Sequence, residues 1–134
     1  MSVAIVVLAA LAQGATSLVD AAARQDWPAV RVLVGDGADV HIPRADGVTA
    51  LLWAAHWDNL ETVKLLLDTG ADPNVADDHG VTSLMRACEN ASVEVVRVLL
   101  EAGTNPNAAQ TSGLTALMLA AETGNRDVVR ALVT

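Results

Sequence analysis

The chain is short of several residue types, and each shortage narrows what it can be. Its 134 residues include no Tyr or Phe, three Trp and a single Cys. Ala, Val and Leu must therefore form the core, and side chains of this size suit short, closely packed helices. With 52% hydrophobic residues, the chain is long enough for one folded unit with a sizeable core.

Basic residues are also scarce. Eight Lys and Arg stand against 16 Asp and Glu, which gives a formal net charge of −8, and Lys64 is the only lysine. This charge repels a nucleic-acid backbone, so we expect no nucleic-acid partner. It also disfavours binding to an anionic membrane surface. The simplest role for the acidity is solubility.

Signatures of catalysis and of metal binding are missing from the sequence. It contains no G-x-S-x-G, H-E-x-x-H, P-loop or G-x-G-x-x-G pattern. Of the three histidines, His41, His56 and His79, none has a second His or Cys four residues away. We therefore expect no enzyme activity, no metal and no cofactor.

The chain does have a repeat with a period of 33 residues. Residues 46–74, DGVTALLWAAHWDNLETVKLLLDTGADPN, align without a gap with residues 79–107, HGVTSLMRACENASVEVVRVLLEAGTNPN. A period of this length indicates a stack of similar units. The same spacing gives four copies, the last of them incomplete, at about 14–46, 47–79, 80–112 and 113–134.

Each copy predicts a helix, a turn, a second helix and a loop. In the second copy, Gly47 permits a turn with positive φ, and Thr49 is placed to cap the first helix. The second helix is expected over residues 60–68, and Gly70 ends it. One such unit cannot bury both of its apolar faces, so it must stack on a neighbour. The predicted fold class is an all-α solenoid.

The pattern G-x-T-x-L-x-x-A-A, followed by V-x-x-L-L-x-x-G-A-D-x-N, resembles the ankyrin repeat over about residues 14–134. The resemblance implies a non-catalytic module that binds another protein. The family's usual T-P-L-H reads T-A-L-L at 49–52, T-S-L-M at 82–85 and T-A-L-M at 115–118. Because the family's histidine ties neighbouring loops together, its absence predicts less rigid loops.

Residues 1–12, MSVAIVVLAALA, precede the repeats. About ten consecutive apolar residues are too few to span a membrane. Ala10-Leu11-Ala12 is the small-x-small pattern that precedes signal-peptidase cleavage, although no Lys or Arg comes before the apolar run. We predict a signal peptide at 1–12 and an ankyrin-repeat domain at 13–134, similar to small exported bacterial proteins of the family. The alternative is a helix that caps the first repeat of a cytoplasmic protein.

Two residues of the third copy interrupt its small and apolar pattern. Cys88 stands where the other copies have alanine, so we expect a buried small side chain. Arg86 is expected to pack its stem and to direct its charged end to Glu89 or to solvent.

One column of equivalent positions holds His56, Glu89 and Glu122 in successive copies. His56 is thus a possible partner for Glu89 across the stack, and the two glutamates resemble a carboxylate pair. The simpler reading is a set of solvated helix ends. No nucleophile accompanies them, so we assign no catalysis.

The resemblance implies a concave binding surface made of loop tips and first-helix ends. Trp57 is the strongest candidate for a contact residue on this surface, because the family usually has a small or polar residue there and Trp is frequent in binding hot spots. Its alternative role is to lie flat over Trp27 or Trp53. The positions implied are Arg24, Ala45, Asp46, Val48, His56, Trp57, Asp78, His79, Val81, Glu89, Asn90, Thr111, Ser112, Leu114, Glu122 and Thr123.

The sequence therefore favours a monomeric protein-interaction module whose partner carries basic groups. It would be periplasmic or secreted if residues 1–12 are a signal, and it would not remain inserted in a membrane after cleavage. An alternative is that the sequence is the N-terminal regulatory or targeting part of a longer chain. That alternative rests on the position of Thr134, which falls inside the last predicted helix.

The export hypothesis predicts a mature protein that lacks residues 1–12. Intact-mass measurement of the protein purified from its native host should give a mass that begins at Gln13. Retention of Met1 or Ser2 would instead support the N-terminal capping helix.

Overall fold

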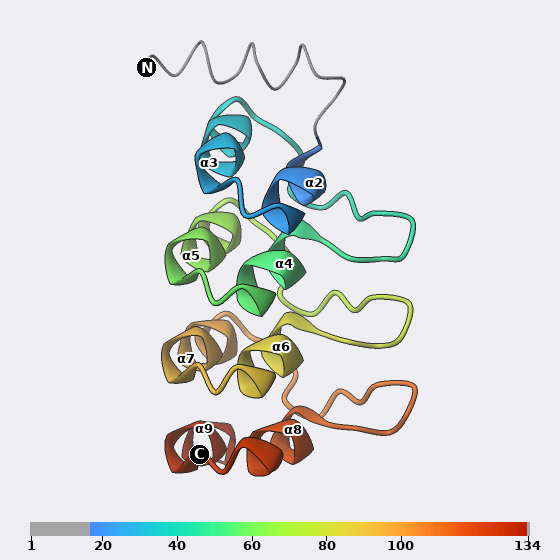
Figure 1. Ribbon diagram of the computed structural model, residues 1–134, viewed down its shortest axis with the longest axis vertical. Helices are drawn as coiled ribbons and strands as arrows, with labels where there is room; N and C mark the ends of the chain where they lie inside the picture. The colour runs from blue at the N-terminus through green and yellow to red at the C-terminus, as the bar shows by residue number, and fades with distance from the viewer. Residues whose placement is uncertain (1–16, 134) are drawn as a thin grey trace.

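A computed structural model of the protein describes residues 17–133, and within them the chain forms eight α-helices in four stacked pairs (Figure 1). Residues 1–12, predicted as a signal peptide or a capping helix, lie outside the described residues. The helices are α2 Leu18–Ala23, α3 Trp27–Gly35, α4 Ala50–His56, α5 Leu60–Asp68, α6 Ser83–Glu89, α7 Val93–Glu101, α8 Ala116–Thr123 and α9 Arg126–Val133.

The stack has two columns of helices and a row of loops (Figure 1). The first helices α2, α4, α6 and α8 form one column, and the second helices α3, α5, α7 and α9 form the other. The long loops between pairs project sideways from the column of first helices. This confirms the predicted all-α repeat fold. None of the helices between residues 17 and 133 has the length and apolar character needed to cross a bilayer.

The helix boundaries of the second copy agree with the prediction. The Thr49 hydroxyl accepts a hydrogen bond from the backbone N–H of Leu52, at 3.3 Å, and so caps α4. Helix α5 covers residues 60–68, and Gly70 follows it with a φ of 104°. The same threonine cap recurs at Thr82 and Thr115.

Small side chains fill the contact between successive first helices. Ala54, Ala87 and Ala120 occupy equivalent positions and are fully buried. Cys88 is buried as predicted, and desolvation raises the pKa of its thiol to about 12. The thiol is therefore protonated and unreactive at neutral pH.

The loops are joined by backbone hydrogen bonds, although the histidine typical of the family is missing. The Asp78 N–H donates to the carbonyl of Asp46 at 3.0 Å, and the Thr111 N–H donates to that of His79 at 2.9 Å. This close approach favours glycine at two equivalent loop positions, Gly47 and Gly80. A Cβ on Gly47 would lie 3.0 Å from Asp78 Oδ1, and φ there is already positive, at 84°.

His41 provides a further tie between copies. Its Nε2 lies 2.9 Å from the carbonyl oxygen of Gly70, and its Nδ1 lies 2.9 Å from Asp39 Oδ1. Both partners only accept hydrogen bonds, so the geometry is satisfied when both ring nitrogens carry protons. The hydrogen bond with Asp39 accordingly raises the pKa of His41, with Gly70 contributing next, and the bonds from His41 lower the pKa of Asp39.

The fourth copy exposes a face that the inner copies cover. Leu84 on α6 is 1% exposed because α8 packs over it, whereas its equivalent Leu117 on α8 is 41% exposed. Met118 is exposed as well, while its equivalent Met85 is fully buried. Identical side chains in the same register therefore differ in burial.

This difference predicts unequal costs for the same substitution. Leu84→Ala should lower the free energy of unfolding by about 2–5 kcal/mol, because it leaves a buried cavity. Leu117→Ala should cost about 1 kcal/mol or less, because much of its side chain already meets solvent. Urea denaturation of the two variants checks this, and equal costs would contradict the exposed position of Leu117.

The His41 bridge predicts a pH-dependent stability. Because the folded-state pKa of His41 is raised, its stabilisation is full below the ordinary value of 6.5 and is lost as pH rises through the folded value. His41→Asn, which copies Asn74 at the equivalent position, keeps a donor for Gly70 without the charge. The melting temperature of the native protein relative to this variant should be higher at about pH 5.5 than at about pH 8.5. A pH-independent difference would show that the imidazolium contributes nothing.

Candidate functional site

The predicted binding residues lie in two settings, which together we call the loop–helix face. One setting is the loop tips at residues 45–48, 78–81 and 111–114. The other is the carboxyl-terminal ends of the first helices, at Arg24 and at residues 56–57, 89–90 and 122–123. A cavity lined by both loop and helix residues shows that the two settings adjoin between the second and third copies.

Most predicted loop residues are exposed, but one is not. Val81 is only 7% exposed and packs in the core, so its predicted role as a surface contact is wrong. Its N–H donates to Asp77 Oδ1 and its carbonyl accepts from the Asp77 N–H, which closes the loop and turns the side chain inward. Val48 and Leu114, at the equivalent positions, are half-buried. The exposed loop residues are Ala45, Asp46, Asp78, His79, Thr111 and Ser112.

Aspartates shape the loop tips. Asp46 Oδ1 accepts from the Val48 N–H at 3.1 Å. Asp77 Oδ1 accepts from two N–H groups, those of His79 at 2.9 Å and Val81 at 3.0 Å. These bonds fix the carboxylates in place by turn geometry. The two bonds to Asp77 both use Oδ1.

Three aromatic rings form a cluster at the end of α4. The rings of Trp53 and Trp57 are nearly parallel, with centroids 6.2 Å apart and an interplanar angle of 16°. His56 meets both rings edge-on, at 5.4 Å and 4.8 Å. Trp57 is 39% exposed. The two roles considered for Trp57 are thus combined: it stacks on Trp53 and still presents part of its ring to solvent.

The charged groups near this cluster are paired within their own copy. Arg86 Nη1 lies 3.1 Å from Glu89 Oε2, as the sequence predicted for the end of the arginine side chain. Glu89 therefore pairs with Arg86 rather than with His56. Desolvation, followed by the charge of Arg86, lowers the pKa of His56, so the imidazole is neutral at pH 7. Glu122 is exposed at the end of α8.

Two predicted contact residues are already engaged at helix ends. Asn90 Nδ2 donates to the carbonyls of Ala55, at 3.0 Å, and His56, at 2.7 Å, and so caps the last turn of α4 from the next copy. The Thr123 hydroxyl donates to the carbonyl of Ala120 at 2.7 Å. The amide of Asn90 therefore holds two copies together, which its place in the repeat did not reveal.

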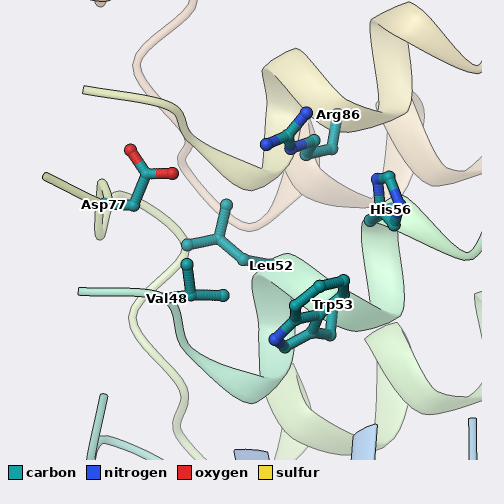
Figure 2. A pocket seen from close by; sticks show the side chains of 6 residues that line it. All are labelled: Val48, Leu52, Trp53, His56, Asp77 and Arg86. Carbon is teal, nitrogen blue, oxygen red and sulfur yellow. The ribbon is translucent and has the colours of Figure 1, made fainter. Parts of the chain in front are cut away.

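A cavity of about 90 Å³ opens between the second and third copies (Figure 2). Only two of its six lining residues, Val48 and His56, were predicted from the sequence as binding residues. One difference visible in the sequence is at position 52, where leucine stands in place of the longer methionine of the third and fourth copies. The lining residues are Val48, Leu52, Trp53, His56, Asp77 and Arg86.

The chemistry of this face suits contact and binding. Its parts are a fixed aromatic surface, a small apolar-walled cavity and several carboxylates at defined positions. Among residues 17–133, no group of three or more His, Cys, Asp or Glu side chains is arranged to hold a metal ion.

Comparison with known proteins bears on the same residues. The family model for ankyrin repeats, which spans three copies, matches residues 18–110 and again residues 78–134. A search of curated proteins gives no match. The two matched ranges together cover all eight described helices, and the 33-residue period, the paired helices and the projecting loops agree with them. The chain belongs to the ankyrin-repeat family.

Proposed function

We propose that this protein is a non-catalytic interaction module that binds another protein through its loop–helix face. Ankyrin repeats are generally protein-interaction modules. The main observation that supports binding at this face is the fixed but partly exposed ring of Trp57. Stacking on Trp53 and contact with His56 hold its ring in one orientation, while 39% of the residue remains exposed. A large aromatic side chain fixed in this way loses little entropy when a partner covers it.

The charge of the face favours a basic partner. Asp46, Asp78 and Glu122 are exposed on it, and the whole chain carries a formal net charge of −8. An acidic surface speeds the approach of a basic partner and disfavours acidic competitors. We infer that a single copy of the protein acts as the binding unit.

The proposal includes a compartment. The apolar run and the Ala10-Leu11-Ala12 pattern support export to the periplasm or to the outside of the cell. The partner would then be a protein of that compartment. The first described helix, α2, begins at Leu18, after the proposed cleavage site.

Substitution of Trp57 tests the proposed function. Trp57→Ala should weaken binding of a captured partner about 30-fold or more, as expected for a hot-spot residue. The fold should survive, since loss of one aromatic pair is worth about 0.5–1.5 kcal/mol, or a few degrees in melting temperature. Affinity capture from the native host with quantitative mass spectrometry, followed by titration of the captured partner, measures both effects.

The matched control is Arg97→Ala. Arg97 is exposed on α7, in the column of second helices, away from the loops. This variant should bind like the native protein. If Arg97→Ala loses binding and Trp57→Ala retains it, the interface lies on the column of second helices instead. A collapse of the melting temperature in Trp57→Ala would make this tryptophan a packing residue.

A further inference from the structure

The cavity between the second and third copies has one apolar and one charged side (Figure 2). Val48, Leu52 and Trp53, from α4 and the loop before it, lie together on one side. Asp77, from the next loop, and Arg86, from α6, lie across from them. At about 90 Å³, the cavity is far smaller than the roughly 300–1,000 Å³ typical of small-molecule sites. It has room for one side chain.

One lining position differs in length from its equivalents in the repeat. Leu52 corresponds to Met85 and Met118 in the following copies. Met85 is fully buried, and its side chain is longer than that of Leu52, which lines the cavity. A methionine at position 52 is therefore a substitution that the fold already accommodates elsewhere.

Asp77 is the uncompensated charge of the cavity. The positive charge of Arg86 is met by Glu89, 3.1 Å away. His56 is neutral at pH 7, because burial and the charge of Arg86 lower its pKa. Among the ion pairs of residues 17–133, none involves Asp77. The lining thus carries one carboxylate without a cationic partner, across the cavity from the Trp53 indole ring.

We propose that this cavity is a specificity pocket that takes one arginine or lysine side chain from the partner protein. The aliphatic stem packs against Val48 and Leu52. The cationic end pairs with the Asp77 carboxylate, across the cavity from the Trp53 ring. Basic side chains are the class that combines an apolar stem with a charge of this sign. The inference rests on the proposed function and names the part of the partner that the loop–helix face recognises.

The geometry disfavours the other classes of side chain. An acidic side chain would meet the Asp77 carboxylate at close range in a partly dehydrated space. An apolar side chain would fill the cavity but would leave that carboxylate without a cationic partner and less exposed to water. The choice between a basic and an apolar occupant is therefore the decisive comparison.

Small probes test the pocket without knowledge of the partner. The full chain, labelled with ¹⁵N, has three indole N–H signals, and Trp53→Phe assigns the one that belongs to the pocket. Nα-acetyl-arginine amide should shift the Trp53 signal in a saturable way. Its neutral analogue, Nα-acetyl-norleucine amide, should bind about fivefold more weakly, because it lacks the contact with the Asp77 carboxylate.

Three variants locate the effect. Asp77→Asn keeps the oxygen that accepts the two loop N–H groups but removes the charge, so it should abolish the preference for arginine and leave norleucine binding unchanged. Leu52→Met should fill the cavity and weaken both probes. Asp68→Asn is the matched control, because it removes an exposed aspartate at the end of α5, in the column of second helices and outside the cavity, and should keep the preference. Melting temperatures confirm that each variant is folded.

Each contrary result overturns the inference. If the norleucine probe binds as tightly as the arginine probe or more tightly, the pocket does not prefer basic side chains. An equal effect of Asp68→Asn and Asp77→Asn would show that the preference for arginine reflects the overall negative charge of the protein rather than this pocket. Absence of any saturable shift at Trp53 would show that no pocket operates. These outcomes leave the Trp57 capture experiment unaffected, so failure of the pocket and failure of the proposed function are distinguishable.

Discussion

A helix pair of this repeat has two apolar faces and can bury only one of them by itself. The stack depends on that constraint, because each copy is stable only when its second face meets a neighbour. The contact is made by small side chains, with Ala54, Ala87 and Ala120 fully buried at equivalent positions. Small residues let successive first helices approach closely. The absence of Phe and Tyr agrees with this, because larger side chains would hold the helices further apart. On α8, against which no further first helix packs within residues 17–133, leucine and methionine side chains are exposed in the register that buries them elsewhere.

The same spacing sets the position of the binding groups. Because successive copies approach closely, the loops come near enough for the Asp78 N–H to reach the Asp46 carbonyl, and a Cβ at Gly47 would lie only 3.0 Å from Asp78 Oδ1. The loop tips are thus held at a fixed separation by the backbone, without the histidine that the family uses. Recognition then depends on which side chains the fixed positions carry. One copy supplies both Trp57 and the short Leu52, so the aromatic surface and the cavity lie together.

The fold could be predicted from the sequence because its signals are local and repeated. The Thr49 cap and the boundaries of α5 each depend on a few consecutive residues, and the Arg86–Glu89 pair depends on one turn of helix. The site could be predicted only in outline. A 33-residue register places residues in columns, but it does not say which way a side chain turns or what it meets in the next copy. Val81 turned inward, and the Asn90 amide proved to cap α4, because both depend on contacts outside the local pattern.

Departures from the repeat are the most informative positions, but they do not all have the same meaning. His41 replaces the asparagine of the next copy, and both of its ring nitrogens find partners, Asp39 and Gly70, within the chain. The hydrogen-bonding groups of the His41 ring are thus satisfied within the protein and need no external ligand. Trp57 is satisfied in part, since one face stacks on Trp53 while the rest of the ring stays exposed. At the cavity, Leu52 lines an open space, and the Asp77 carboxylate accepts two loop N–H bonds but has no ion-pair partner in residues 17–133. Where a residue differs from its repeat equivalents and finds no partner within the protein, contact with a side chain of a binding partner is the simplest physical explanation.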